Sequence, residues 1–486
     1  MGILTVMILI PLVAAVAIFC ARKSIDVCKG IALIASGVVL LMSLYLWVAF
    51  DPSASGYQFE ILLRWFPALG VSFGLGVDGL ALPFVLLTAL LSLLVIIYTN
   101  DIPERKALYY ALVLLVELGL IGVFTATDLF LFYIFWEVVL LPMFFMIGIW
   151  GGNFRSYAAM KFLIYTHVAS VIMMLAIGAM YFKAEDLLGY YTFYLPDLMA
   201  AGFPVDFQIM VFPALLFAFA VKLATVPFHT WLPDAYVEAP IGGTILLSGI
   251  IIKMGGYGLI RVAYMLNPDG AAHYTTLVVV LALVTIVFGA FVALTQDSMR
   301  RMLAYSSVSH MGFIIIGVAS MTYFGVRGAI FQMVAHGLIF AALFMVCGII
   351  EERAKTDLIS KVGGLYYQIP KAMTLFIIAI LGSIGIPGLA GFVGEFSVLA
   401  GVVEAYGWLA GFVILGMVIS VAFYLWTFQR IGFGQISENM AGAKDMNIYE
   451  GAPIVILVVL VVFLGIMPTP IFTVIEKSAS VLISLL

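Results

Sequence analysis

Ionisable side chains stand inside several long apolar runs of this 486-residue chain. Two are lysines, Lys222 and Lys253, and three are glutamates, Glu117, Glu137 and Glu395. A charge at the centre of a bilayer costs at least about 2.5–3.5 kcal/mol, so residues of this kind usually serve a function. We expect all five side chains to face the interior of a helix bundle, where they pair with each other or line water.

A glutamate and a lysine that can separate and rejoin inside a membrane form a proton switch. Desolvation lowers the pKa of a lysine and raises that of a carboxyl group, and an adjacent opposite charge reverses both effects. One pKa unit is worth about 1.4 kcal/mol, so a moderate rearrangement loads or releases a proton. Lysine suits this role better than arginine, which stays charged. The sequence therefore predicts a Glu137–Lys222 switch and a lateral relay through Lys253 to Glu395, with Glu117 in a supporting role.

Histidines extend this set, because an imidazole changes its charge near neutral pH. His229, His310 and His336 lie in or beside the same apolar segments. His167 has a similar setting with less support, and His273 stands at the end of a segment. No two histidines share i, i+4 spacing with carboxylates, so we expect no metal site.

Several of these residues also have a structural interpretation. Glu137 and Lys222 would then form a static salt bridge between helices. Glu395 would cap a helix that restarts after a break. Lys253 lies too deep in its segment for its ammonium to reach the interface easily. A lone histidine in a membrane helix is often a packing residue with satisfied hydrogen bonds.

The composition places these residues in a polytopic membrane protein. Hydrophobic residues make up 65% of the chain and charged residues only 10%, against about a quarter in soluble domains. The first apolar run, 3–19, lacks a basic leader and a small-residue cleavage pattern, so we interpret it as a retained span. The net charge of −4 argues against a nucleic-acid partner. Three scattered cysteines and the absence of nucleotide-binding motifs place any redox cofactor on another chain.

Hydropathy divides the chain into about fourteen helices, and helix is the backbone that a bilayer core requires. The expected spans are 2–20, 29–49, 78–98, 106–124, 128–149, 157–182, 206–228, 240–262, 273–295, 301–319, 323–350, 372–401, 406–430 and 450–468. Fifteen lysines and arginines fall in loops on one side, five fall on the other, and Lys222 and Lys253 lie within spans. The positive-inside bias therefore predicts that both termini are on the outer side.

Two of the expected spans carry helix breakers. Pro227 interrupts the seventh span towards its end, with Pro233 following, and Pro387 interrupts the twelfth in the stretch GSIGIPGLAGF. The two spans are five apart and so cross in opposite directions, which favours an inverted repeat with two five-helix halves. The predicted fold is all-α, with helices 1–3 in 1–105, a first repeat in 106–265, a second repeat in 272–431 and a last helix with a tail in 450–486.

The motifs resemble those of the antiporter-like subunits of respiratory complex I, a family that includes Mrp-type antiporters. The stretches that carry the resemblance are LFLFYIFWEVVLLPMFFMIGIWGG, VKLATVPFHTWLPDAYVEAP, LLSGIIIKMGGYGLIR, AYSSVSHMGFIIIG, QMVAHGLIFAALFMVCGIIEER and GIPGLAGFVGEF. The chain looks most like the M-type subunit, which corresponds to mitochondrial subunit four, because the M-type has a glutamate at the position of Glu395 where its relatives have lysine.

The resemblance implies a role for each candidate residue. Glu137 would modulate Lys222, Lys253 would be the central relay lysine, and Glu395 would feed an outer half-channel. His229, His310 and His336 match histidines of the family's hydrophilic axis, and Glu117 matches an acid that helps to couple neighbouring subunits.

The resemblance also implies a proton-translocating subunit of a redox-driven pump coupled to quinone reduction on other subunits. Flavin, iron–sulfur clusters and quinone are expected on partner subunits, with none in this chain. The expected partners are other antiporter-like and small membrane subunits, the lipid bilayer, and protons or sodium ions. A prokaryotic plasma membrane is the expected location. A Mrp-type cation/proton antiporter without redox coupling is the alternative, and the electron donor stays open among NADH, deazaflavin and ferredoxin.

Overall fold

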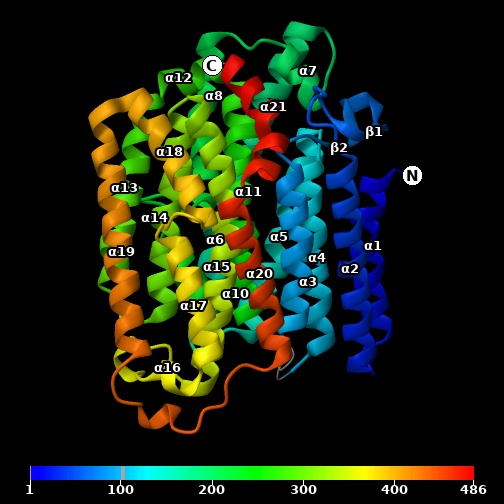
Figure 1. The fold of residues 1–486 in the computed structure, drawn as a ribbon. Helices are drawn as coiled ribbons and strands as arrows, with labels where there is room; N and C mark the ends of the chain where they lie inside the picture. The colour runs from blue at the N-terminus through cyan, green and yellow to red at the C-terminus, as the bar shows by residue number, and fades with distance from the viewer. Residues whose placement is uncertain (1, 100–103, 486) are drawn as a thin grey trace.

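The computed structural model describes residues 2–99 and 104–485 and shows a bundle of long, roughly antiparallel helices (Figure 1). Twelve helical segments within the described residues are long and apolar enough to cross a membrane. Two shorter apolar helices, Leu82–Tyr98 and Pro370–Ser383, lie among them. The all-α polytopic fold is confirmed. The number of about fourteen crossings stays a prediction.

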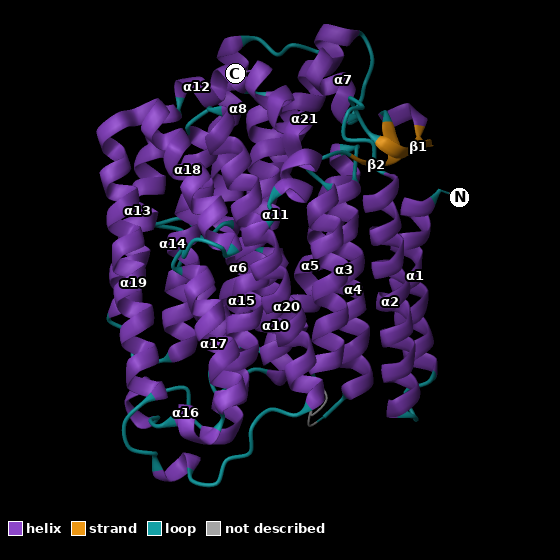
Figure 2. Cartoon of the chain, viewed as in Figure 1, coloured by secondary structure: helices purple, strands orange, loops and turns teal. Residues whose placement is uncertain are grey.

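The first helices lie at one side of the bundle and precede a small β-hairpin (Figure 2). Helices α1 (Ile3–Cys20) and α2 (Ile25–Ala49) are followed by the antiparallel strands β1 (Gln58–Phe66) and β2 (Val71–Val77). Gly70 adopts a φ of 64° in the turn between the strands, a conformation that glycine reaches without steric cost. This hairpin lies between two expected spans, and nothing in the hydropathy pattern predicted it.

The remaining elements follow in chain order. They are α3 (Leu82–Tyr98), α4 (Lys106–Thr125), α5 (Leu129–Trp150), α6 (Arg155–Leu188), α7 (Leu195–Ala200), α8 (Val205–Lys222), α9 (Trp231–Glu238), α10 (Ile241–Leu246), α11 (Lys253–Gly258), α12 (Pro268–His273), α13 (Thr275–Leu294), α14 (Met299–Ala319), α15 (Tyr323–Ala354), α16 (Leu365–Gln368), α17 (Pro370–Ser383), α18 (Ala390–Tyr406), α19 (Ala410–Gly432), α20 (Ile448–Ile466) and α21 (Thr469–Leu485). The sequence analysis treated the region of α21 as a tail.

Both expected helix breaks are present. Helix α8 ends at Lys222 and α9 begins at Trp231, with a cis Val226–Pro227 peptide bond between them. Helix α17 ends at Ser383 and α18 begins at Ala390, and Gly385 and Gly388 there have φ angles of 72° and 94°. Only glycine adopts such angles readily, so this break depends on its glycines as well as on Pro387.

The most deeply buried helices are those that hold the central ionisable residues. The apolar windows of Ile241–Tyr264 and of α15 are 100% buried, and that of α14 is 94% buried, against 33% for α2. The segment 241–264 contains two π-helical turns, η2 (Leu247–Ile251) and η3 (Leu259–Tyr264), which flank α11. Such turns are rare and are frequently found at functional sites. Lys253 is the first residue of α11 and so lies between them.

The two ends of the bundle differ. Both termini lie toward the end that carries the hairpin, α7 and α12, which we call the hairpin end (Figure 1). The opposite end carries α16 and the long connection between α19 and α20, and we call it the α16 end. The side of the membrane that each end faces stays a prediction.

Candidate proton-transfer site

Lys253 lies against His336 in the centre of the bundle. Its Nζ is 2.8 Å from Nδ1 of His336 and also donates to the carbonyl oxygen of Ser248. Nε2 of His336 is 3.2 Å from Oγ of Ser307 on α14. Lys253 and His336 are 0% and 1% exposed, so neither side chain can exchange protons directly with bulk solvent.

His310 connects this pair to Glu395 just beyond the break between α17 and α18. Nδ1 of His310 is 3.2 Å from Oε1 of Glu395, and the two rings of His310 and His336 have their centroids 5.6 Å apart. Because a carboxylate only accepts hydrogen bonds, Nδ1 of His310 is the donor in this contact. Four of the predicted residues are therefore brought together in one buried row, which runs from Lys253 through His336 and His310 to Glu395.

Neutral polar side chains line this row. Gln332 donates to Glu395 Oε1 at 3.4 Å, and Oγ of Ser383 is 3.3 Å from Nε2 of His310. Tyr424 of α19 accepts from Ser383 at 3.0 Å and is 2.9 Å from Oγ of Ser306. Hydroxyl groups both donate and accept hydrogen bonds, so the serine and tyrosine side chains can pass protons as well as orient the imidazoles.

Lys222 stands apart from that row. It is the last residue of α8, it is 2% exposed, and its Nζ has no hydrogen-bond partner among the described residues. The ammonium lies over the rings of Trp136 and Phe162, at 5.2 and 5.9 Å from their centroids. Cation–π contacts of this kind stabilise a desolvated cation by about 2 kcal/mol, less than a hydrogen-bonded counter-ion supplies.

Glu137 does not pair with Lys222. Its Oε2 is 3.2 Å from Nδ1 of His167 on α6, and its Oε1 has no hydrogen-bond partner. The static Glu137–Lys222 salt bridge considered from the sequence is therefore absent from this structure. His167, which has less support from the sequence than the other histidines, is the residue that contacts the Glu137 carboxylate.

The other two predicted residues lie outside the row. His229, in the connection between α8 and α9, has an unpartnered Nδ1 and packs against Phe288 and Tyr305, with ring centroids 5.1 and 6.0 Å away. Glu117 of α4 is fully buried and accepts a hydrogen bond of 2.6 Å from Ser36 of α2. Its hydrogen-bond partner therefore lies on α2 and is not one of the predicted relay residues.

Comparison with known proteins decides the family. The family model described as NADH:quinone oxidoreductase/Mrp antiporter, transmembrane, matches residues 126–423. The chain belongs to this family. The F(420)H(2) dehydrogenase subunit M of Methanosarcina mazei is 36% identical over 99% of this chain and 98% of its own length. The NADH-quinone oxidoreductase subunit M of Rhodobacter capsulatus is 40% identical over 94% of this chain and 90% of its own.

Solved structures also have the fold of this chain. A chain of respiratory complex I from Thermus thermophilus with bound NADH superimposes with a TM-score of 0.90 and 30% identity, over 99% of both chains. A chain of the Mrp complex from Dietzia sp. gives a TM-score of 0.87 at 22% identity, over 99% of both chains, which shows the shared fold alone. The M-type resemblance inferred from Glu395 is confirmed, because both curated relatives are M subunits.

For this member of the family, sequence reasoning missed the hydroxyl and amide groups of the row. Ser307 stands three residues before His310, and Gln332 stands four before His336, so each shares a helix face with a predicted histidine. That spacing was a usable signal. No such spacing relates Tyr424 to a predicted histidine, because Tyr424 reaches the row only through the packing of α19.

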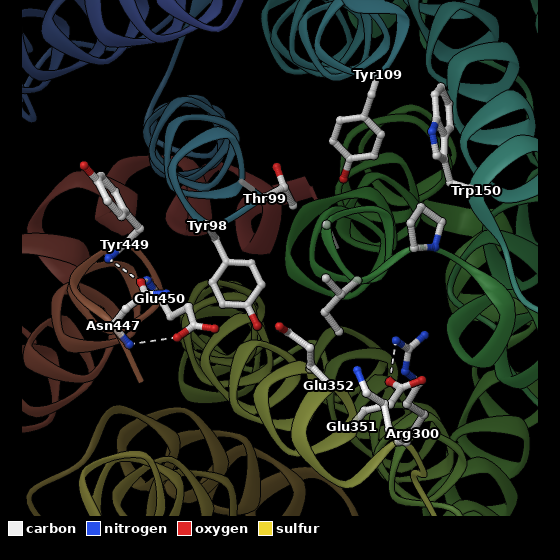
Figure 3. Close-up of a pocket in the computed structure, with 15 residues that line it drawn as sticks. Tyr98, Thr99, Tyr109, Trp150, Arg300, Glu351, Glu352, Asn447, Tyr449 and Glu450 are labelled. Atoms are coloured by element: carbon white, nitrogen blue, oxygen red, sulfur yellow. Dashed lines mark hydrogen bonds and ion pairs between the residues drawn. The ribbon is translucent and has the colours of Figure 1, made fainter. Parts of the chain in front are cut away.

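One cavity in the described part of the chain lies apart from the row. It holds about 540 Å3 at the α16 end and is lined by the ends of α3, α4, α5, α14, α15 and α20 (Figure 3). The Arg300–Glu351 ion pair, at 2.6 Å, forms part of its wall. None of the predicted site residues lines it.

Proposed function

We propose that this chain moves protons across the membrane as the M-type subunit of a complex I-like, redox-driven pump. The observation that carries the proposal is the buried row Lys253–His336–His310–Glu395. Relatives named as NADH-quinone oxidoreductase and F(420)H(2) dehydrogenase subunits support the redox coupling.

Proton movement along the row needs only exchange between neighbouring groups. Lys253 gives a proton to Nδ1 of His336, whose Nε2 proton then passes toward His310. His310 takes it at Nε2 and gives up its Nδ1 proton to Glu395. The gap between the two imidazoles is longer than a hydrogen bond, so water or a small ring movement bridges it. Lys222 and Glu137 act before the proton enters this row. Lys222 stands at the helix break, and the Glu137 carboxylate can move toward its ammonium group or away from it.

Redox chemistry belongs to partner subunits in this proposal. Flavin, iron–sulfur clusters and quinone lie on those subunits, and the chain contributes only the proton path. The two repeats, 106–265 and 272–431, supply one broken helix each. Both termini and the hairpin end face the outer side of a prokaryotic plasma membrane, and Glu395 opens toward that side.

The test uses the purified complex reconstituted in liposomes. Quinone reduction and proton uptake are measured together for Lys253→Met, with Lys23→Met as the control because the Lys23 side chain is exposed. We expect Lys253→Met to lose most proton translocation per electron while Lys23→Met behaves as wild type. Full coupling in Lys253→Met would overturn the proposal. The absence of flavin and iron–sulfur absorbance in the purified assembly would favour a Mrp-type antiporter instead.

A further inference from the structure

The contact between Glu137 and His167 places a second titratable partner beside the proposed switch. We propose that His167 and Lys222 compete for the Glu137 carboxylate, and that His167 acts as a positioning residue that controls when Lys222 is paired. This inference rests on the proposed function and assigns a new residue to it.

The first observation is that the carboxylate has turned away from the lysine. Glu137 and His167 side chains are 24% and 54% exposed, whereas Lys222 is 2% exposed. The carboxylate therefore lies on the outer face of α5 and α6, while the ammonium lies inside, over Trp136 and Phe162. Glu137 nevertheless stays close to Lys222 along the chain, because it directly follows Trp136, over whose ring the ammonium lies.

The second observation is that both members of the expected pair are left incomplete. Oε1 of Glu137 and Nζ of Lys222 are buried atoms without a hydrogen-bond partner. A buried charge without a partner is costly, which favours a second state in which both groups are paired. In the other state the carboxylate leaves the imidazole and completes the coordination of the ammonium.

The charge of His167 determines which group the Glu137 carboxylate pairs with. A protonated His167 attracts the carboxylate, leaves Lys222 unpaired and favours loss of its proton to the relay. A neutral His167 releases the carboxylate, which then holds the proton on Lys222. No bond other than N–H bonds forms or breaks, and the proton lost by Lys222 passes to the relay.

The other ionisable groups near this site cannot replace His167. Those on the elements packed against α6 are Tyr133 and Glu137 of α5, Asp197 of α7, Asp206 and Lys222 of α8, and Asp234, Tyr236 and Glu238 of α9. Asp234 is held by Lys161 of α6 at 2.7 Å, and Asp197 accepts from Thr192 at 2.9 Å near the far end of α6. His167 is thus the basic side chain that reaches Glu137 in this structure.

Helix α6 also bonds to the chain beyond the helix break. These bonds link the break to the competition between His167 and Lys222 for Glu137. Lys161 bonds Asp234 of α9, and the Tyr165 hydroxyl accepts a hydrogen bond of 2.9 Å from Thr230 in the break. A shift of α6 would therefore change the His167–Glu137 contact and the position of the segment after Lys222 together.

The experiment compares His167→Gln and His167→Lys in the reconstituted complex. Glutamine keeps a hydrogen-bond donor but cannot titrate, and lysine carries a positive charge at every accessible pH. Proton uptake per electron is measured from pH 6 to 8.5, with His273→Gln as the control because that histidine is exposed and outside the row. A contact worth one pKa unit changes the population of a paired state about tenfold, which sets the scale of the effect.

We expect His167→Gln to flatten the pH dependence of coupling and His167→Lys to lower coupling across the range. We also expect His167→Lys/Glu137→Gln to match Glu137→Gln alone, because the histidine acts only through the carboxylate. Wild-type pH profiles in both single variants would overturn the inference. If these variants were silent while Lys253→Met was uncoupled, the inference would fail and the proposed function would stand.

Discussion

Nδ1 of His336 lies 2.8 Å from Nζ of Lys253, although 83 residues separate them in the chain. The same imidazole stacks on Phe340, with ring centroids 3.8 Å apart and an interplanar angle of 6°. The ring is therefore held in place by packing while both of its nitrogens face polar partners, Lys253 on one side and Ser307 on the other.

Replacing His336 by Phe should separate packing from proton transfer. Phenylalanine keeps the stack on Phe340 but offers no nitrogen to Lys253. We expect the complex to assemble and reduce quinone, with proton translocation per electron reduced severalfold. The measurement is proton uptake alongside quinone reduction in liposomes. Unchanged coupling in this variant would show that protons bypass His336.

Glu395 should tolerate a change of sign better than loss of its titratable group. Both Glu395→Lys and Glu395→Ala remove the carboxylate that accepts from His310 and Gln332, but only the lysine variant keeps an ionisable group next to His310. We expect partial pumping in the lysine variant and little in the alanine variant. The opposite order, with alanine active and lysine dead, would mean that the negative charge itself is required.

Gly391 should be intolerant of any side chain. A Cβ at this position would lie 1.9 Å from the carbonyl oxygen of Gly382, a backbone atom that cannot move aside without shifting α17. Overpacking of this kind costs about 1–3 kcal/mol or more. We expect Gly391→Ala to lower the thermal stability of the complex, measured by its unfolding temperature. Gly178→Ala is the matched control, because nothing lies within 4 Å of a Cβ there.

The buried ion pair between Asp78 and Arg261 should stabilise the hairpin end. Arg261 Nη2 is 2.6 Å from Asp78 Oδ2, and the arginine side chain is 5% exposed. Removing one partner of such a pair costs about 3–5 kcal/mol, while replacing both is often nearly neutral. Asp78→Asn should therefore lower the unfolding temperature more than Asp78→Asn/Arg261→Met does. Equal losses in the two variants would mean that the pairing itself contributes little.

The sequence alone predicted the membrane class, the positions of most of the long helices and both breaks. Hydrophobicity and helix breaking are local properties, so Pro227, Pro387 and the apolar runs could be interpreted without knowing any neighbour. The cost of charge in a bilayer also singled out Lys222, Lys253, Glu137 and Glu395, because that cost depends on depth and not on the partner.

The tertiary structure decided which of these residues touch. Glu395 lies in the break region of α17 and α18, and its contact with His310 on α14 arises only when those helices pack. Hydrogen-bond partners such as Gln332 and Tyr424 were not predicted, since a buried polar atom accepts whichever donor the packing brings to it. The tertiary structure also pairs Glu137 with His167 on α6 and leaves Lys222 on α8 without a hydrogen-bond partner. Charge types in the sequence allow either pairing, and only the relative placement of α5, α6 and α8 selects one.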